Sequence, residues 1–594
     1  MVVGPFGMNS SNRAGRKQAP YPIKTLLLMA ALANCLAADD AGSIARHHYE
    51  DLIRRGVVTG AAFAAIDHGR ITSTEFFGKM RPDSLWRAAS TSKALTALAI
   101  LQLAARGQID LDTDINAYLT TFKVPAFGGK PITARELLNH TSGLDDPFVG
   151  SAYLDSAGRQ PGLAEAMRRW LPRSVYLPGQ VRLYSNFGYG ILGALIEDVA
   201  HVSYEEYMRA QVLQPLGMRE STFEQPLPAE LRKRVVPSLE RNVFGRIRPA
   251  ELLYHRATPG GGLTASFQDL VRFAQCIQTS VPAGGVPVSR VEDYLGVGVK
   301  WGQRYWYAGG DLGGYHTVLL GFPDRDRALV TVAAGASEMA TWGLAPDIVH
   351  SWFGDEKAAR QADEHNTSNP HAVERCREVA GIYRPVRYPH FDIAKTFAIT
   401  MDEAVRCDPD GSIQYDNQRW TPDAPLHFRQ GGGTEELAFE RNSAGRVEFM
   451  DKSAQRIAWY LSGRAAIVLY FGFIALGVCA LFIQRKSGNL RALRVTAGLI
   501  LAHSVGWLAA ALAADPQHLI IGSPRYLACA LAIGTLVPLV WIYLVAVTVR
   551  AIFTKRWPAS ALAISAAGAL AFAFYIPFEF YWRIMLWPFA STGY

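Results

Sequence analysis

Metal-ligand motifs, nucleic-acid-binding motifs and a cysteine framework are absent from this sequence, and each absence excludes a class of protein. The chain holds only 6 cysteines in 594 residues, too few for a disulfide-built scaffold. It has no His-Glu-x-x-His segment, and its 14 histidines lack the spacing of metal ligands, so we expect no metal and no other cofactor. A net charge of +8 occurs without interleaved basic and aromatic residues, which argues against nucleic acid as a partner.

Long apolar runs are present instead, near the C-terminus. Residues 465–483, 495–514, 526–549 and 558–580 are each apolar over a length that crosses a bilayer as a helix. They predict an all-α four-helix transmembrane bundle over 464–590, with the lipid bilayer as its partner. The loops after the first and third runs are basic, which places them in the cytoplasm by the positive-inside rule. The runs contain too few polar residues to favour a transporter.

Residues 1–38 have the pattern of an export signal, either cleaved or kept as an anchor. Basic residues precede the apolar run 25–33, and small residues follow it. Cys35 lies in a segment that loosely resembles a lipoprotein box. A signal and an anchor both place the next segment outside the cytoplasm, as the basic loops do. We therefore expect a multi-pass protein of the bacterial inner membrane whose domains between the signal and the apolar runs are periplasmic.

The stretch that carries chemistry is Ser90-Thr91-Ser92-Lys93, followed by an apolar, Ala-rich and Leu-rich segment. Three residues separate Ser90 from Lys93, so both side chains lie on one face of a helix that we expect to begin at Ser90. A buried lysine amine can take the proton of a serine hydroxyl. The N–H groups at a helix start can also bind an oxyanion. By itself, a capping serine at an exposed helix start is the better explanation of this short pattern, so the rest of the chain has to decide.

A second stretch, residues 177–193, places a tyrosine before a helix. Pro178-Gly179 predicts a turn, and we expect Asn186 to cap the glycine-containing helix that follows. Tyr184 then lies at a helix N-terminus, which stabilises a phenolate and makes Tyr184 a candidate proton carrier. The alternative for an isolated tyrosine is ordinary core packing.

Five motifs occur in one order, and together they resemble the serine beta-lactamase-related family of class C beta-lactamases, D,D-carboxypeptidases, D-aminopeptidases and related esterases. They span roughly residues 42–355 and are Ser90-x-x-Lys93, Leu137-Leu138-x-His140-Thr141-Ser142-Gly143-Leu144, Tyr184-Ser185-Asn186 after Pro178-Gly179, Pro215-Leu216-Gly217-Met218 and Gly260-Gly261-Gly262-Leu263-Thr264.

The resemblance implies the fold and the chemistry of this segment. The fold is α+β (α/β), an antiparallel sheet flanked by helices with an all-helical subdomain inserted after the Ser90 helix. Ser90 attacks a carbonyl to form an acyl-enzyme, Lys93 and Tyr184 pass the proton to the leaving group, and Asn186 holds the network. Water then releases the acyl group.

A further motif of the family, called the third motif below, lies on a strand beside the serine nucleophile, and here it departs from the family pattern. Where relatives carry Lys-Thr-Gly or His-x-Gly, alignment gives Ala308-Gly309-Gly310, so the usual cation is missing. The backbone N–H groups of Ser90 and Asp311 remain available for an oxyanion hole. Loss of the cation favours esters or amides without a free carboxylate. We expect His316 to be a satisfied core histidine.

A small antiparallel beta barrel or sandwich is predicted over 372–458, after a polar linker at 356–371. Strand-like pieces alternate there with turn clusters, and 437–440 with 446–450 read as a hairpin. Cys376 and Cys407 both fall in this domain, where an oxidising compartment permits a disulfide.

Two functions therefore remain open for the whole chain. The first is an outward-facing serine hydrolase that cleaves an amide or ester, such as a D-amino-acid peptide, a peptidoglycan-related peptide or an acylated metabolite. The second is a catalytically inactive sensor or cell-wall-binding protein on the same fold. The sequence leaves the substrate, protein partners and oligomeric state unassigned.

Overall fold

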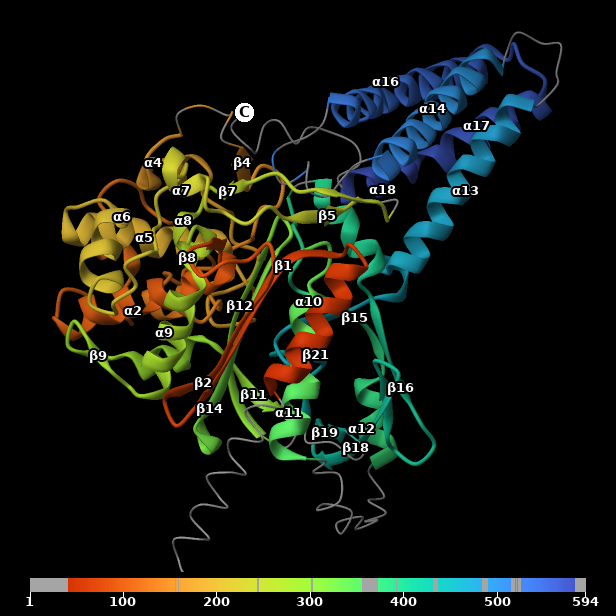
Figure 1. Ribbon diagram of the computed structural model, residues 1–594. Coiled ribbons are helices and arrows are strands. Elements are labelled where there is room, and N and C mark those ends of the chain that lie inside the picture. Colours follow the sequence, from red (N-terminus) through yellow and green to blue (C-terminus); the bar gives the residue numbers. More distant parts are fainter. Residues whose placement is uncertain are drawn as a thin grey trace, which may run out of the picture.

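Three structural units follow one another along the chain: a sheet with helices on both faces, a small barrel and a long helical bundle (Figure 1). The computed structural model describes residues 41–582 except 155, 157, 159, 243–244, 301–302, 355–371, 392, 431–435, 483–489, 514–518, 520 and 522–524. The predicted export signal at 1–38 and the linker at 356–371 lie outside the described residues.

The first unit is built on a six-stranded sheet with strand order β11-β12-β13-β14-β1-β2. All neighbouring strands are antiparallel. The strands are β1 Val58–Asp67, β2 Arg70–Gly78, β11 Gly296–Lys300, β12 Gln303–Leu312, β13 Tyr315–Phe322 and β14 Arg327–Gly335. β1 and β2 form an antiparallel hairpin whose turn contains Gly69, with φ of +71°.

Side chains alternate between the two faces of the sheet along each strand, and helices cover both faces. On β1, Ala62 and Ala64 join the core beneath helices α2 (Ser92–Ala105), α5 (Asn186–Ala200) and α9 (Phe267–Gln278). Phe63 and Ala65 face the opposite side, where helical residues 41–54, α10 (Met339–Trp342) and α11 (Ala345–Phe353) pack. The result is a three-layer domain with α2, which follows Ser90, inside it.

The segment between α2 and α9 contains several helices joined by loops and short strands, so it is not all-helical, which corrects one expectation. Its helices are α3 Ala134–Leu138, α4 Leu163–Arg169, α5, α6 Tyr204–Tyr207, α7 Ala229–Arg232 and α8 Thr258–Gly261. Two short strand pairs lie among them, β4 (Ala152–Leu154) with β7 (Leu253–His255) and β5 (Leu239–Arg241) with β6 (Ile247–Pro249). The β4–β7 pair joins segments that lie far apart in the chain, whereas β5 and β6 are close in sequence, and both pairs satisfy backbone groups of extended segments.

The second unit is a closed antiparallel barrel in which each strand pairs with the next and β15 pairs with β22. Its strands are β15 Gly381–Pro385, β16 Glu403–Cys407, β17 Ile413–Tyr415, β18 Gln418–Ala424, β19 His427–Gln430, β20 Glu436–Arg441, β21 Val447–Met450 and β22 Ala454–Ile457. The predicted hairpin is β20–β21. A disulfide joins Cys376 of α12 (Ala372–Val379) to Cys407 at the end of β16.

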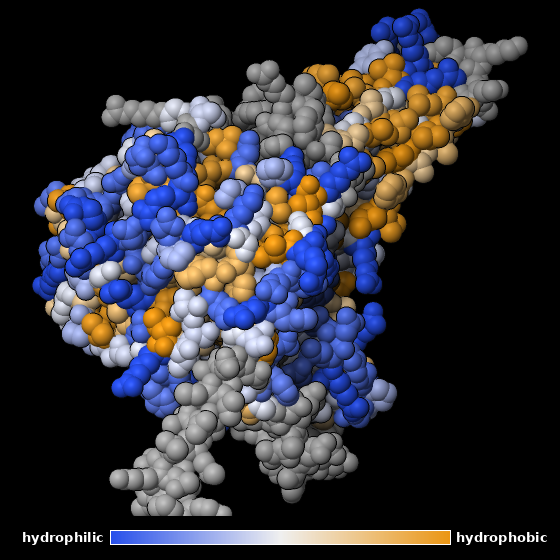
Figure 2. All heavy atoms as spheres, viewed as in Figure 1, coloured by the Kyte–Doolittle hydropathy of each residue, from blue (hydrophilic) through white to orange (hydrophobic). Residues whose placement is uncertain are grey.

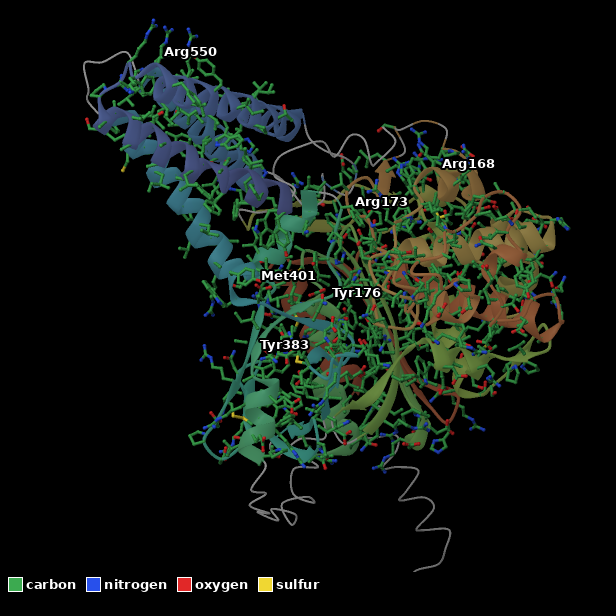
Figure 3. All side chains as sticks on the ribbon, turned by 180° about the vertical axis from the view of Figure 1, so that it is seen from behind. Arg168, Arg173, Tyr176, Tyr383, Met401 and Arg550 are labelled. Carbon is green, nitrogen blue, oxygen red and sulfur yellow. A yellow bond between two sulfur atoms is a disulfide. The ribbon has the colours of Figure 1, made fainter. Side chains whose placement is uncertain are left out.

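The third unit consists of apolar helices whose surface is markedly more hydrophobic than that of the other two units (Figure 2). They are α13 Gly463–Phe482, α14 Arg491–Ala513, α16 Arg525–Thr554, α17 Ala559–Ala573 and α18 Tyr575–Tyr581. Four stretches are long and apolar enough to cross a membrane: Gly463–Phe482, Arg491–Ala510, Ile533–Thr554 and Ala559–Phe578. Arg550 lies at the end of the bundle farthest from the sheet and the barrel (Figure 3).

The near end of the bundle packs against the other two units. Phe148 and Val149, from a loop of the first unit, share an apolar cluster with Ala398 of the barrel unit and with Tyr470 and Trp507 of the bundle. The backbone N–H of Gly150 also donates to the carbonyl of Leu519 at 3.1 Å. The loop that carries Phe148 is thus held by contacts with the helical bundle.

Candidate active site

Ser90 lies in a sharp turn between a strand and a helix. The chain leaves β3 (Leu85–Arg87), passes through the short 3-10 turn Ala89–Thr91 and enters α2 at Ser92. Ala89 has φ of +47°, a left-handed conformation that costs energy for a residue with a side chain. The helix therefore begins two residues later than predicted, because this strained turn precedes it. Ser90 lies in the turn and is half-exposed.

Two proton-carrying groups converge on the Ser90 hydroxyl. The phenol of Tyr184 donates a hydrogen bond to Ser90 Oγ at 2.7 Å. The amine of Lys93 donates to the same oxygen at 3.2 Å, as the three-residue spacing predicts. Lys93 Nζ also lies 4.6 Å from the centre of the Tyr184 ring. The structure thus brings together the three residues that the sequence singled out.

Burial tunes the Lys93 amine. Its side chain is 6% exposed, and removal from water lowers the pKa of the amine below its usual value, although Tyr184 and Asp146 act in the opposite direction. The amine also donates to Asn186 Oδ1 at 2.6 Å and to the carbonyl of Gly260. A lysine with a lowered pKa can reach the neutral form that accepts a proton.

Asn186 is held by an acidic residue that sequence analysis missed. Its side-chain nitrogen donates to Asp146 Oδ2 at 2.9 Å, and its backbone nitrogen donates to Asp146 Oδ1 at 2.7 Å. Ser185, not Asn186, caps α5 by accepting from the nitrogen of Gly188 at 3.0 Å. The expected cap was therefore wrong by one residue, and Asn186 is free to orient its oxygen toward Lys93. Burial raises the pKa of Asp146, with Arg387 opposing.

His140 positions the tyrosine. Its ring stacks on Tyr184 with 4.3 Å between ring centres, and its Nδ1 accepts a hydrogen bond from the backbone nitrogen of Ser185 at 3.2 Å. Burial, followed by the charges of Lys93 and Arg182, holds the pKa of His140 well below its usual value. A neutral imidazole can accept that bond, so the ring stays fixed against the phenol.

The matching family model decides the relationship of this chain to known proteins. The model described as Beta-lactamase matches residues 45–350, which include Ser90, Lys93, Tyr184 and Asn186. The chain belongs to the beta-lactamase family. Its similarity to serine hydrolases of the beta-lactamase and esterase type is the same one that the ordered motifs indicated.

Two curated relatives illustrate the range of the family. Esterase EstB of Burkholderia gladioli is 29% identical over 365 residues, which cover 53% of this chain and 88% of EstB. Protein flp of Staphylococcus aureus strain N315 is 28% identical over 183 residues, which cover 29% of this chain and 36% of flp.

Solved structures in the family are also similar to this chain. The octameric penicillin-binding protein homologue from Pyrococcus abyssi is 22% identical, covers 68% of this chain and 97% of its own, and has a TM-score of 0.46. A class C beta-lactamase is 16% identical, covers 53% of this chain and 97% of its own, and has a TM-score of 0.45.

In this family member, the third motif lies on β12 beside Ser90. A Cβ atom added to Gly310 would lie 2.5 Å from the carbonyl oxygen of Ala88 and would also collide with the backbone nitrogen of Ser90. β11 pairs with β12 only as far as Tyr307. The edge of β12 from Ala308 to Asp311 is therefore not paired with β11, and this part of the strand lies next to the Ser90 turn.

The other two residues of the third motif and the nearby His316 can also be located. The methyl group of Ala308 is buried in the core, and Gly309 lies beneath the side chain of Tyr307. His316 bonds Asp311 at 2.6 Å through Nδ1 and the carbonyl of Gly335 at 3.0 Å through Nε2. His316 is thus a satisfied histidine, as expected.

The family site contains two supporting residues to which the sequence assigned no role, Asp146 and His140. His140 belongs to a recognised motif, and Asp146 follows that motif within a few residues, so their proximity in sequence was the available signal. Among the described residues, no group of three or more His, Cys, Asp or Glu side chains could hold a metal ion.

Proposed function

We propose that this chain is a membrane-anchored serine hydrolase that cleaves an ester or amide through an acyl-enzyme at Ser90. The observation that carries the proposal is the convergence of Tyr184 at 2.7 Å and Lys93 at 3.2 Å on one serine oxygen. A nucleophile within hydrogen-bond reach of two proton carriers, one of them a lysine whose pKa is lowered by burial, is the arrangement that acyl transfer requires.

The first half-reaction follows from this geometry. Ser90 Oγ bonds to the carbonyl carbon of the substrate as its proton leaves toward Lys93 and Tyr184. The carbonyl oxygen becomes negatively charged and is stabilised by the N–H groups of Ser90 and Asp311. The bond to the leaving group then breaks, and Tyr184 returns a proton to the departing oxygen or nitrogen.

The second half-reaction reverses these roles. A water molecule gives a proton to the same pair and its oxygen bonds to the acyl carbon. The Ser90 ester bond then breaks, and the pair returns the proton to Ser90 Oγ as the acid is released. Asn186, held by Asp146, keeps the Lys93 amine directed at Ser90 in both steps. Ser90, Lys93, Tyr184 and the two backbone donors therefore suffice for the bond-making and bond-breaking steps.

The reaction class is supported by the name of one relative. EstB, the relative that is 29% identical to this chain, is named an esterase. We extend ester or amide hydrolysis to this chain on the strength of its own Ser90, Lys93 and Tyr184. Candidate substrates are D-amino-acid peptides, peptidoglycan-related peptides and acylated metabolites.

We propose that the first two units lie in the periplasm, on the outer side of a bacterial inner membrane. Arg550 lies at the far end of the bundle, where the positive-inside rule expects the cytoplasm (Figure 3). The Cys376–Cys407 disulfide supports an oxidising compartment for the barrel. The export-signal pattern at residues 1–38 supports the same orientation.

Covalent labelling tests the proposal. The full chain in detergent is incubated with a fluorophosphonate, from which Ser90 Oγ displaces fluoride, and separately with a fluorescent penicillin, and each adduct is located by mass spectrometry. We expect an adduct on Ser90 with the phosphonate and none in Ser90→Ala. Penicillin labelling at Ser90 would indicate cell-wall peptides as substrates.

The buried methyl group of Ala308, in the place where relatives carry a cation, favours one alternative, an inactive sensor or cell-wall-binding protein. That protein would give no Ser90 adduct with either reagent although folded. The labelling experiment therefore decides between the two functions.

A further inference from the structure

A segment of the barrel unit reaches into the active site of the first unit. It follows β15 and is attached on both sides of Arg387. Val386 packs in an apolar cluster with Val181 and Leu183, which directly precede Tyr184. On the other side, both the backbone nitrogen and the ring Nδ1 of His390 lie 3.0 Å from oxygens of the Asp145 carboxylate.

Arg387, between these two attachments, lies over the catalytic tyrosine. The central carbon of its guanidinium is 4.1 Å from the centre of the Tyr184 ring. The hydroxyl of that ring reaches Ser90, so a single tyrosine side chain separates the guanidinium from the nucleophile. A guanidinium stacked on an aromatic ring keeps its N–H donors at its edge, where they remain available to a ligand.

Among the residues that the structure describes, these donors have no acceptor. Within the described part of the chain, no hydrogen bond or ion pair ties Arg387 to a carboxylate, and the residue is exposed. Asp146 is close enough for the charge of Arg387 to influence it but forms no ion pair with it. The Asp145 carboxylate is occupied by His390. An exposed cation without a counter-ion, held rigidly beside a nucleophile, suits an anionic group of a substrate.

We propose that Arg387, supplied by the barrel, binds a carboxylate on the ester or amide held at Ser90 and so provides the positive charge that Ala308 lacks. This inference rests on the proposed acyl transfer at Ser90. It reverses the expectation from sequence that the substrate has no free carboxylate, because the missing cation is replaced from another domain. Arg387 is a specificity-determining residue, and the substrate class is an ester or amide with a carboxylate a few bonds from the scissile carbonyl.

The carboxylate can belong to the leaving group or to the acyl group, and matched substrates distinguish these sources. For the leaving group we would compare hippuryl thioglycolate with its methyl ester. For the acyl group we would compare p-nitrophenyl hydrogen adipate with its methyl ester. Within each pair, only the charge of the carboxylate differs appreciably.

The expected result is a higher kcat/KM for the acid than for the methyl ester in at least one pair, and a loss of that preference in Arg387→Gln. We expect the preference to fall by about 10- to 100-fold, mostly through KM, because a charged hydrogen-bonded pair is removed. Arg387→Lys should keep part of it, since one positive charge remains. The full-length enzyme in detergent is used throughout.

Arg173→Gln is the matched control. Arg173 is a second exposed arginine where these units meet, with its guanidinium carbon 5.2 Å from the ring centre of Phe391, and it is labelled in Figure 3. Within the part of the chain that the structure describes, Arg173 forms no contact with Tyr184. Its substitution should leave the ratio of acid to ester rates unchanged.

Three outcomes would overturn the inference. They are a wild-type enzyme without preference in either pair, an Arg387→Gln enzyme that loses both rates equally, and an equal loss of preference in Arg173→Gln. In each case, Ser90 labelling by the fluorophosphonate would show that the proposed hydrolase stands. Absence of that labelling in the folded wild-type protein would overturn the hydrolase and this inference together.

Discussion

The amide nitrogen of Asn186 donates a hydrogen bond to Asp146 at 2.9 Å. This bond fixes which end of the amide faces the active site, so the oxygen of Asn186 points to Lys93 at 2.6 Å. An acidic residue that touches neither Ser90 nor Tyr184 therefore orients the base. The same carboxylate binds the first backbone N–H group of α5.

Asp146→Ala should lower kcat by about 100-fold, because Asn186 can then rotate and misplace the lysine amine. Asp114→Ala is the matched control, since Asp114 accepts from the backbone nitrogen of Asn116 at 2.9 Å at another helix start. Both variants should lose about 1 kcal/mol of folding stability. Steady-state kinetics with a neutral ester and thermal melts give the two readouts. Equal kcat in both variants would contradict the orienting role.

The pH dependence of the reaction should report Lys93. Because burial lowers the pKa of its amine, the neutral form that accepts the Ser90 proton appears at lower pH than for a free lysine. kcat/KM for a neutral ester should therefore rise as pH rises through that pKa. The positive charge of Arg387 contributes to the lowered value, so Arg387→Gln should move the midpoint to higher pH. An unchanged or lower midpoint would show that the charge of Arg387 does not influence the Lys93 amine. In the control variant Arg173→Gln, the midpoint should equal that of the wild type.

Lys93→Arg should lower kcat/KM by about 10²- to 10⁴-fold, although it keeps the positive charge. A guanidinium stays protonated and cannot accept the serine proton. Circular dichroism and a thermal melt would establish that the variant is folded before rates are compared. Activity near that of the wild type would assign the role of base to Tyr184 alone.

Gly310→Ala should abolish most acylation, by about 10²- to 10³-fold, because the added carbon pushes β12 away from Ser90 and displaces an oxyanion donor. The collision is with backbone atoms of Ala88 and Ser90, which lie in the strained turn and cannot move aside. Gly309→Ala is the comparison, since its added carbon meets the movable end of the Tyr307 side chain. The rate of Ser90 labelling by the fluorophosphonate should fall much further in the first variant. Similar rates in both would remove Gly310 from the site.

Cys376→Ser should lower the free energy of unfolding of the barrel by about 2–4 kcal/mol. The disulfide joins two cysteines that are 31 residues apart in sequence and so restricts the unfolded chain. Urea melts followed by tryptophan fluorescence, with and without reductant, measure this difference. Reductant should destabilise the wild type and leave the variant unaffected. A wild type insensitive to reductant would show that the pair is not oxidised.

Local and ordered patterns determined much of this protein. The spacing of Ser90 and Lys93 placed both on one side of the site, because helical neighbours three residues apart face the same way. The order of five motifs identified the family. The same resemblance predicted that Tyr184 lies beside Ser90, and the two side chains are hydrogen-bonded. Apolar length alone located the four membrane-spanning candidates, since the bilayer imposes a minimum helix length.

Details that depend on exact backbone geometry were less accessible. The cap of α5 is Ser185 rather than Asn186, and the Ser90 helix begins at Ser92. One residue along a turn redirects a side chain completely, and propensities at a helix start are shared by Ser and Asn alike. Only the folded backbone distinguishes such neighbours.

The charge of the active site was decided by tertiary structure. Read along the chain, the third motif at Ala308 lacks a cation, and Arg387 is one arginine among many in a separate domain. Folding places that arginine 4.1 Å from Tyr184, although about 200 residues separate them. Periodicity and motif spacing describe interactions among near neighbours in sequence, whereas the docking of the barrel on the hydrolase domain depends on the shape of both surfaces. The sequence alone therefore determined Ser90 and the two side chains that converge on it, and the tertiary structure decided which charged side chain lies beside them.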